Sequence, residues 1–513
     1  MEKSRYHTRV LAAAIALIAA GAGAGLAAPA AADPGWAPLA PLRSGGPQAA
    51  TDRYIVVFRP QAALRSNRTT VEHAVAQRGG EVVAEYSHVL NGFAARLPES
   101  ALAAVRADSS VAYVQRDSII RGDGAPVAGG GAAASVVQPN PPSWGLDRID
   151  QRSQPLDASY SYDSTGTGVT AYVVDSGIRA SHVDFGGRAQ GVYDAVGDGN
   201  GTNDCHGHGT HVAGTVGGAT YGIAKSVQIR AVRVLQCDNS GWESDLIEGM
   251  DWIAANRAPR SVANFSLQGY GPAASEAAES LINTGVQTVF IANNFNGDAC
   301  FNAPRSPRGI TVGATDINDA RASFSSFGPC VDVFAPGVNI TSAGNFSDTA
   351  SAPGWSGTSM AAPHVTGWVA RYMEEFPSAT LAQSKSALIA SSTKDVLTDV
   401  GAGSPNRLLF ADPTAGGADT APPSRPGRPA ASNITTTSVR LRWSGSIDNV
   451  GVVGYDVYRE AGAVDVVVAS PTGTSATITG LARSTRYTFY VRARDAAGNV
   501  STPSQTRTIT TRS

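Results

Sequence analysis

The chain has 513 residues, which is too long for one compact core, so we expect three or four segments with separate roles. Hydrophobic residues make up 42% and charged residues 16%, which is typical of a folded and moderately polar protein. The 40 Lys and Arg residues nearly balance the 42 Asp and Glu residues. The charge therefore gives no reason to expect nucleic acid or a membrane surface as a partner.

The N-terminus has the pattern of a secretory signal. Basic residues precede an apolar run over residues 10–20, and small residues continue to Ala32. The strongly apolar stretch is about half as long as the roughly twenty residues needed to span a bilayer, which disfavours a transmembrane anchor. We predict a signal peptide over residues 1–32 and secretion to the extracellular space.

Residues 33–50 are rich in Pro, Ala and Gly, and we expect them to form a disordered linker. Residues 51–120 then predict a small domain, with strands at 54–58, 82–86, 92–97 and 111–114 and helices at 69–79 and 98–107. The order strand-helix-strand-strand-helix-strand describes an α/β sandwich. The Gly- and Ala-rich stretch over 121–138 is expected to be a linker suited to proteolytic cleavage.

The pattern changes over residues 139–412. Apolar strand runs such as 169–174 and 286–292 alternate with helical segments such as 244–256, 361–374 and 380–391. This alternation predicts an α/β fold with a mostly parallel sheet and helices on both faces. The strands lack alternation of polar and apolar residues, as expected of strands that are covered on both sides.

The C-terminal part differs again. Residues 413–427 form a linker by composition. Over residues 428–513, segments with period-two alternation, for example 439–443, 455–458 and 487–493, predict an all-β sandwich.

Three motifs in the central segment carry chemically useful side chains. The first is the apolar run 171–174, which ends in Asp175. In open α/β sheets ligands bind beyond the carboxyl ends of strands, where Asp175 would lie. Taken alone, this aspartate is more typical of a turn or a helix cap than of an active site.

The second motif, DCHGHGTHVAG, contains His206, His208 and His211 within six residues. A metal cluster is one interpretation, but the H-E-x-x-H pattern of a zinc helix is missing. The glycines and small residues indicate a tight entry into a buried helix, which suits one base placed at the helix start. The third motif, GTSMAAPHV, places Ser359 at a glycine-led helix start, where backbone N–H groups are available to an oxyanion. A serine N-cap is the alternative there.

Asp, His and Ser occur here in the chain order of the catalytic residues of subtilisins, which catalyse acyl transfer. The wording DSG, HGTHVAG and GTSMAAPHV resembles the subtilisin superfamily, and WGLDRIDQR and SFSSFGPCVDVFAPG resemble its proteinase K and aqualysin branch. The resemblance covers residues 144–410 and implies a serine endopeptidase that cleaves extracellular proteins through an acyl-enzyme. It implies Ser359 as nucleophile, His208 as base and Asp175 as the group that orients the imidazole. His206 and His211 are then structural.

The resemblance also implies the groups around the substrate. Asn294 matches the family's side-chain donor to the oxyanion. The expected substrate-binding residues are Ser266, Leu267, Gln268, Gly269, Ala292 and Asn293. The family usually has glycine at the positions of Gln268 and Asn293, so the S1 pocket is expected to be smaller or more polar. These departures also support an alternative, a catalytically impaired binding protein with the same fold, although the triad is intact.

Four cysteines in an exported chain suggest disulfides, and close Cys pairs typical of a metal site are missing. The sequence alone leaves three connectivities open. The resemblance implies the pairs Cys205–Cys237 and Cys300–Cys330.

A structural calcium ion is also implied by the resemblance. Its expected ligands are the carbonyls of Pro307 and Gly309 and the carboxylate of Asp332. We expect no organic cofactor.

Residues 54–117 resemble the family's inhibitory propeptide through YIVVF, VLNGFAARL and VAYVQRD. This implies an intramolecular inhibitor whose C-terminal end lies in the active-site cleft, and autocatalytic cleavage between about Arg121 and Gln138. The C-terminal part resembles a fibronectin type III module, with Trp443 in its core and Leu481 beside Tyr487. A surface-binding module and a spacer are both open for it. The partners expected are protein or peptide substrates, and we expect a monomer.

Overall fold

The structure, a computed structural model, describes residues 39–60, 65–122, 137–415, 421–448, 452–462, 465–495 and 499–513. The predicted signal peptide and residues 123–136 of the predicted cleavage linker lie outside the described residues. Among the described residues, no helix is both long enough and apolar enough to cross a membrane.

The N-terminal domain is a mostly antiparallel sheet with two helices packed on it. Its elements are β1 (Leu42–Arg43), β2 (Ala49–Phe58), α1 (Arg65–Ala76), β3 (Glu81–Tyr86), β4 (Gly92–Arg96), α2 (Glu99–Ala107) and β5 (Val111–Gly122). The strand order is β1-β5-β2-β4-β3. Val56 and Phe93 of the sheet share a buried core with Val75 of α1 and Val105 of α2. The predicted strand-helix-strand-strand-helix-strand order is confirmed.

Two features of this domain differ from the sequence prediction. Residues 39–50 are not all irregular, because β1 pairs in parallel with β5 and β2 already begins at Ala49. Val114 of β5 donates its N–H to the Pro41 carbonyl over 2.9 Å, so the edge of β5 gains a partner there. Strand β5 also extends to Gly122, well beyond the predicted end at residue 114.

The central domain is built on a nine-stranded sheet. Its strand order is β19-β20-β16-β15-β14-β12-β8-β10-β9. The strands are β8 (Thr170–Asp175), β9 (Ala189–Asp194), β10 (Gln228–Arg233), β12 (Ser261–Phe265), β14 (Gln287–Ile291), β15 (Ile310–Thr315), β16 (Val333–Pro336), β19 (Thr393–Lys394) and β20 (Arg407–Leu408). Neighbouring strands run parallel except for β19 and β20.

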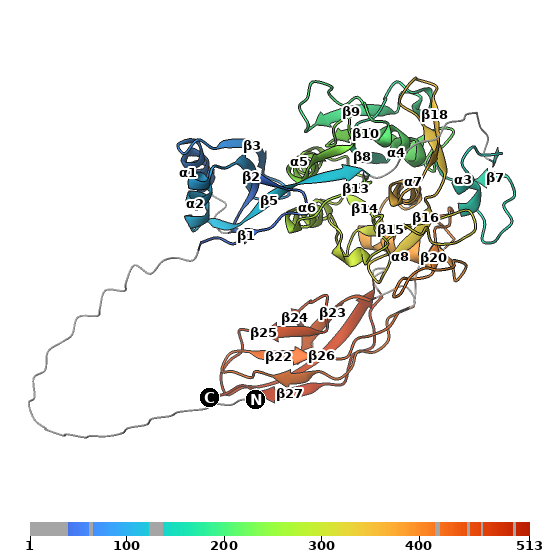
Figure 1. Ribbon diagram of the computed structural model, residues 1–513. Coiled ribbons are helices and arrows are strands. Elements are labelled where there is room, and N and C mark those ends of the chain that lie inside the picture. The colour runs from blue at the N-terminus through green and yellow to red at the C-terminus, as the bar shows by residue number, and fades with distance from the viewer. Residues whose placement is uncertain are drawn as a thin grey trace, which may run out of the picture. The chain divides into compact units, whose positions relative to one another are not determined.

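Helices cover both faces of this sheet (Figure 1). Val173 of β8 packs in one buried cluster with α4 (His208–Gly217) and α7 (Thr358–Glu375). Its neighbour Val174 points to the other face and packs with α5 (Glu243–Asn256) and α6 (Pro272–Asn283). Burial on both faces is the reason why the strands show no polar alternation, and the predicted α/β class is confirmed.

Shorter elements complete the central domain. They are β6 (Val137–Pro139), α3 (Trp144–Ile149), β7 (Ser159–Ser161), a 3₁₀ turn (Val183–Phe185), β11 (Ser240–Trp242), β13 (Leu267–Gln268), a 3₁₀ turn (Ala299–Phe301), β17 (Ile340–Ala343), β18 (Ser351–Trp355) and α8 (Leu381–Ser391). Disulfides join Cys205 to Cys237 and Cys300 to Cys330, as predicted. Each closes a loop of about 30 residues, for which the chain-entropy model gives a stabilisation of about 3–4 kcal/mol.

The C-terminal domain is a sandwich of two antiparallel sheets with the orders β21-β22-β25 and β24-β23-β26-β27. The strands are β21 (Ala430–Ser432), β22 (Val439–Arg442), β23 (Val452–Arg459), β24 (Val466–Ala469), β25 (Ser475–Ile478), β26 (Arg486–Asp495) and β27 (Arg507–Thr510). Trp443 and Leu481 lie in its buried core. The Tyr487 hydroxyl accepts the backbone N–H of Ala482 over 2.8 Å, next to Leu481 as the sequence predicted.

Candidate active site

Asp175 and His208 come together at the carboxyl end of strand β8. Asp175 is the last residue of that strand, and His208 is the first residue of α4. His208 Nδ1 lies 2.7 Å from Asp175 Oδ1, and both side chains are fully buried. Asp175 Oδ1 also accepts the N–H of Ser176 over 2.7 Å. The carboxylate therefore fixes the orientation of the imidazole through its Nδ1 nitrogen.

A buried carboxylate, Asp204, ties the start of α4 to the end of β8. Its oxygens accept the N–H groups of Gly207 over 2.7 Å and Thr210 over 2.8 Å. It also accepts the hydroxyl of Ser176 over 2.9 Å, and that hydroxyl accepts the N–H of Gly209. Burial raises the pKa of Asp204, and the hydrogen bonds from Thr210 and Gly207 oppose that shift. Asp204 thus positions His208 through the helix start.

The indole of Trp355, at the end of β18, packs against all three histidines of the motif. Ring centroids lie 6.0 Å away for His208, 6.1 Å for His206 and 5.1 Å for His211. Complete burial lowers the pKa of His211 to about 3, so this ring is neutral and structural, and its Nε2 lies 3.2 Å from the Ile340 carbonyl.

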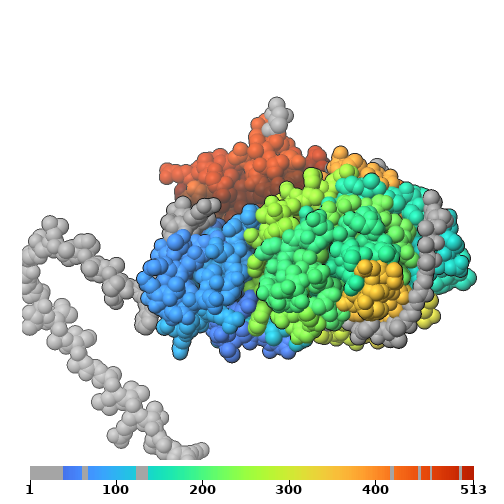
Figure 2. Space-filling model, turned by 90° about the horizontal axis from the view of Figure 1, so that it is seen from above, coloured from blue at the N-terminus to red at the C-terminus, as the bar shows by residue number. Residues whose placement is uncertain are grey.

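Strands β17 and β18 form the hairpin that carries Trp355. Figure 2 shows the gold surface of this hairpin directly beside the green surface of the segment that leads into α4. The contact includes a hydrogen bond of 2.7 Å from the N–H of Val183 to the Asp348 carbonyl. Arg179 Nε also donates to the Asp348 carboxylate over 2.7 Å. The hairpin therefore holds Trp355 against the histidines.

Ser359 is the second residue of α7, immediately after Gly357 and Thr358. It is fully buried in the structure, and its Oγ donates to the Ser266 carbonyl over 3.0 Å. The Ser266 hydroxyl donates in turn to the Ser359 carbonyl over 3.0 Å. Ser359 and Ser266 are thus joined by two reciprocal hydrogen bonds at the start of α7.

Asn294 follows strand β14 and reaches the same helix start. Its Oδ1 accepts both the N–H and the hydroxyl of Thr358, each over 2.9 Å. Since Thr358 fixes the amide oxygen, the orientation of the amide is set and its Nδ2 is directed away from Thr358. The structure thus brings a side-chain N–H donor close to Ser359.

The C-terminal end of β5 lies between the two strands that flank the site. Arg121 pairs with Ser240 of β11 on one side and with Gln268 of β13 on the other, both antiparallel. Gly122 pairs with Leu267, the residue after Ser266. Four predicted substrate-binding residues, Ser266, Leu267, Gln268 and Gly269, thus belong to or border the strand that binds this segment.

The other predicted substrate-binding residues, Ala292 and Asn293, follow β14. Asn293 has a φ of 84°, a left-handed conformation that asparagine tolerates better than most residues. Its Oδ1 accepts the N–H of Asn294 over 3.0 Å, and its Nδ2 lies 3.4 Å from Asn302 Oδ1. Asn302 also donates to the Ala292 carbonyl. The Asn293 side chain is therefore held between Asn294 and Asn302. We call residues 292–294 the pocket wall.

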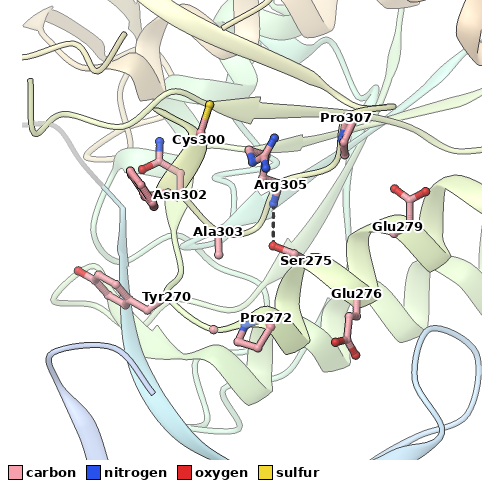
Figure 3. Close-up of a pocket in the computed structure, with 12 residues that line it drawn as sticks. Tyr270, Pro272, Ser275, Glu276, Glu279, Cys300, Asn302, Ala303, Arg305 and Pro307 are labelled. Carbon is pink, nitrogen blue, oxygen red and sulfur yellow. Dashed lines mark hydrogen bonds between the residues drawn. The ribbon is translucent and has the colours of Figure 1, made fainter. Parts of the chain in front are cut away.

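An open pocket of about 580 Å³ lies beside this wall, between α6 and the segment 300–307. Figure 3 shows Asn302, Ala303 and Pro307 along one side of it and Ser275, Glu276 and Glu279 of α6 along the other. The dashed line in Figure 3 is the bond from the Arg305 N–H to Ser275 Oγ, 3.2 Å long. Segment 300–307 is thus attached to α6 as well as to the wall.

Three buried carboxylates and one guanidinium meet where β5 contacts α5. Arg53 donates to Asp117 of β5 and to Asp245 of α5, each over 2.7 Å. Glu243 accepts the N–H of Gly271 over 3.1 Å. Burial, with the charge of Asp117 as the next cause, raises the pKa of Glu243 to about 7. Burial raises the pKa of Asp245 to about 7, against the attraction of Arg53.

The three oxygens predicted to bind calcium do lie together, but they surround a lysine. Lys385 of α8 donates to the Pro307 carbonyl over 3.0 Å, to the Gly309 carbonyl over 2.6 Å and to Asp332 over 2.8 Å. This arrangement, with an ammonium at its centre, does not fit a calcium ion at the same place. Within the described part of the chain, no group of three or more His, Cys, Asp or Glu side chains is placed to hold a metal ion.

Sequence reasoning did not assign roles to Asp204, Thr358, Trp355 or Lys385. Asp204 and Thr358 stand inside the quoted motifs, so their positions were visible, but their hydrogen bonds depend on how α4 and α7 meet other segments. Trp355 and Lys385 lie outside those motifs and carry no pattern that marks them.

Three parts of the chain match known protein families. Residues 166–409 match the subtilase family, residues 53–122 match the peptidase inhibitor I9 family, and residues 423–510 match the fibronectin type III domain. An extracellular serine proteinase from Thermus sp. is 45% identical over 394 residues, which cover 73% of this chain and 92% of that protein. The chain belongs to the subtilase family.

Other members of the subtilase family are also similar. Proteinase R from Parengyodontium album is 37% identical over 72% of this chain and 92% of its own length. Alkaline serine exoprotease A from Vibrio alginolyticus is 43% identical over 71% of this chain and 68% of its own length. The crystal structure of a cold adapted subtilisin-like serine proteinase shares 47% identity and a TM-score of 0.51, over 52% of this chain and 98% of that one.

These matches show a serine endopeptidase with an I9 propeptide domain and a C-terminal fibronectin type III domain. The I9 match confirms the predicted intramolecular inhibitor. The alternative of a catalytically impaired binding protein is not favoured, because the similar proteins are named as proteinases.

Proposed function

We propose that Asp175, His208 and Ser359 are the catalytic triad of this subtilase. The observation that carries the proposal is the fully buried 2.7 Å hydrogen bond between His208 and Asp175. It is supported by the packing of α4, which begins with His208, against α7, whose second residue is Ser359. His208 Nε2 takes the Ser359 proton as Oγ attacks the scissile carbonyl carbon, and then gives it to the leaving amine. Asp175 stabilises the imidazolium that forms. A water molecule then attacks the carbonyl carbon of the acyl-enzyme. His208 takes the proton of the water and gives it to Ser359 Oγ as the acyl group leaves.

The oxyanion is stabilised by two donors in this proposal. One is Asn294 Nδ2, whose direction is set by the bonds from Thr358 to Asn294 Oδ1. The other is the backbone N–H of Ser359, which lies in the first turn of α7 and therefore lacks an intrahelical acceptor. Donors that are held in place before the reaction lower the barrier most, because they need no reorganisation as charge develops.

The substrate is proposed to bind as an extended strand between β11 and β13. The support is the pairing of Arg121 and Gly122 of β5 with these two strands, which places a peptide chain next to Ser266 and hence next to Ser359. The same pairing supports inhibition by the propeptide and its autocatalytic removal at a bond between about 121 and 138. We further propose that a signal peptide over residues 1–32 directs secretion and that the mature enzyme is a monomer.

The experiment compares the precursor from residue 33 with its Ser359→Ala variant by intact mass. The expected result is that the wild type loses the segment before a bond between 121 and 138, whereas the variant stays whole. Ser347→Ala, at an exposed serine of the same domain, serves as control and should process like the wild type. If both folded precursors stay intact, and neither cleaves casein after the propeptide is removed by another protease, the proposed triad is wrong.

A further inference from the structure

The ammonium of Lys385 is bound by oxygens from two neighbouring parallel strands of the main sheet. Pro307 and Gly309 lie directly before β15, and Asp332 lies directly before β16. The Lys385 and Asp332 side chains are only 18% and 19% exposed. Lys385 Nζ lies 2.8 Å from each of the two Asp332 oxygens. A single charged group from α8 thus links the starts of both strands.

The arrangement matches the bonding capacity of an ammonium group. Lysine offers three N–H donors, and the site offers two carbonyls and one carboxylate. The contacts of 2.6 to 3.0 Å are hydrogen-bond distances, whereas calcium takes six to eight oxygens at about 2.3–2.6 Å. One carboxylate neutralises one ammonium, but leaves a divalent ion half neutralised.

A second cation also lies close to Asp332. Burial lowers the pKa of Arg407, at the start of β20, and the negative charge of Asp332 opposes that shift. The remaining lone pairs of Asp332 are used locally, since its Oδ2 accepts the N–H of Thr311 over 2.9 Å. A divalent ion at this place would therefore compete with the Lys385 ammonium for a carboxylate that also accepts the Thr311 N–H, and it would be repelled by the charge of Arg407.

The Lys385 site is connected to the pocket wall, residues 292–294, through one short segment. Residues 302–309 begin at Asn302, which donates to the Ala292 carbonyl, and end at the carbonyls that bind Lys385. Between them, the Ala303 carbonyl accepts the N–H of Gly269 over 2.6 Å. Figure 3 shows Asn302, Ala303, Arg305 and Pro307 on this segment. Lys385 therefore anchors the far end of the segment whose near end supports the pocket wall.

We propose that the Lys385 ammonium is the built-in cation of this site and takes the place of a metal ion there. The chain carries its own counter-charge to Asp332, so the anchoring of β15, β16 and the segment 302–309 does not depend on dissolved calcium. This role of Lys385 concerns folding stability and is independent of the proposed triad.

The test uses the full precursor with Ser359→Ala, so that neither processing nor self-digestion disturbs the measurement. Four forms are compared: this background alone, and with Lys385→Met, Asp332→Asn or both. Lys385→Met keeps the apolar stem and removes the charge. Lys394→Met, at an exposed lysine on β19, is the matched control. Bound calcium per chain is counted by equilibrium dialysis with radioactive calcium, and the midpoint of thermal unfolding is measured in calcium and in chelator.

The proposal expects Asp332→Asn to leave the number of bound calcium ions unchanged. It also expects Lys385→Met to lower the unfolding midpoint by about 5 °C relative to Lys394→Met, equally in calcium and in chelator. The double variant should lose much less than the sum of the two single losses, because the two residues form one pair. The proposal is overturned if Asp332→Asn removes one bound calcium ion, or if the two single losses add.

Discussion

Arg53 of the propeptide domain donates a hydrogen bond of 2.7 Å to Asp245 of the catalytic domain and another of the same length to Asp117 of its own β5. All three side chains are nearly or completely buried. The guanidinium is therefore shared between the inhibitor and the enzyme, and it neutralises carboxylates on both sides of their contact.

The first prediction is that Arg53→Gln weakens inhibition by the propeptide about 10²-fold. Removal of one partner from a buried ion pair leaves uncompensated carboxylates and costs about 3 kcal/mol. The measurement is the inhibition constant of the isolated propeptide domain against the mature enzyme at pH 8, where Asp245 is ionised despite its raised pKa of about 7. Arg59→Gln is the control, because Arg59 is exposed and bonds only within its own domain, to the Ser109 carbonyl. Equal inhibition by both variants would contradict the prediction.

The second prediction is that the propeptide binds more weakly as the pH rises from 5 to 8. Burial raises the pKa of Glu243 and of Asp245 to about 7, from ordinary values of 4.5 and 3.8. Carboxyls with a raised pKa take up protons when the complex forms. Their contribution to binding is therefore complete below pH 4 and is lost as the pH passes 7.

The same inhibition constant, measured between pH 5 and 8.5, checks this direction. Glu243→Gln should flatten the dependence, since an amide cannot titrate. A constant that is independent of pH in the wild type, or one that improves with rising pH, would show that these carboxyls do not control release.

The third prediction concerns Thr358, which we regard as a positioning residue. Thr358→Val removes the hydroxyl that donates to Asn294 Oδ1 over 2.9 Å but keeps the backbone N–H that donates to the same oxygen. We expect kcat to fall about tenfold with little change in KM, because the amide donor is less firmly directed at the oxyanion. Asn294→Ala should reduce kcat about 10²- to 10³-fold. Thr358→Ser, which restores the hydroxyl, should recover the activity; a fall in KM alone would contradict this role.

The fourth prediction is that Asn293→Gly favours larger side chains at the cleavage position. Asn293 occupies a left-handed conformation with φ of 84°, which glycine adopts without strain, and its side chain fills space in the wall. The ratio of kcat/KM for a Phe substrate to that for an Ala substrate should rise about tenfold. Asn296→Gly is the control, because Asn296 is exposed and has a positive φ of 50° on the same loop. An unchanged ratio would place Asn293 outside the specificity pocket.

The motifs predicted that Asp175 ends a strand and that His208 and Ser359 stand at helix starts, and the structure confirms these positions. Their catalytic roles could not be predicted from any one motif and came from the resemblance of all three to the family. The α/β fold could be predicted because the apolar residues in runs such as 169–174 and 361–374 follow the pattern of one type of secondary structure. The full length of β5 could not be predicted, because residues 119–122 form a strand only by pairing with β11 and β13, which lie more than a hundred positions later. Lys385 was missed because only the folded chain shows which oxygens its ammonium meets.

The pairing of β5 with β11 and β13 has a consequence for the proteins that this enzyme digests. Both flanking strands pair with β5 as β-strands do, through main-chain hydrogen bonds. If the substrate takes the place of β5 as proposed, the two exposed strand edges can pair with any extended backbone. In a folded protein, most backbone N–H and C=O groups are already hydrogen-bonded to one another and cannot pair with these edges. The rate of cleavage of a folded substrate protein is then set by how often a segment of several residues unfolds locally. The enzyme therefore selects among folded substrates by their local stability.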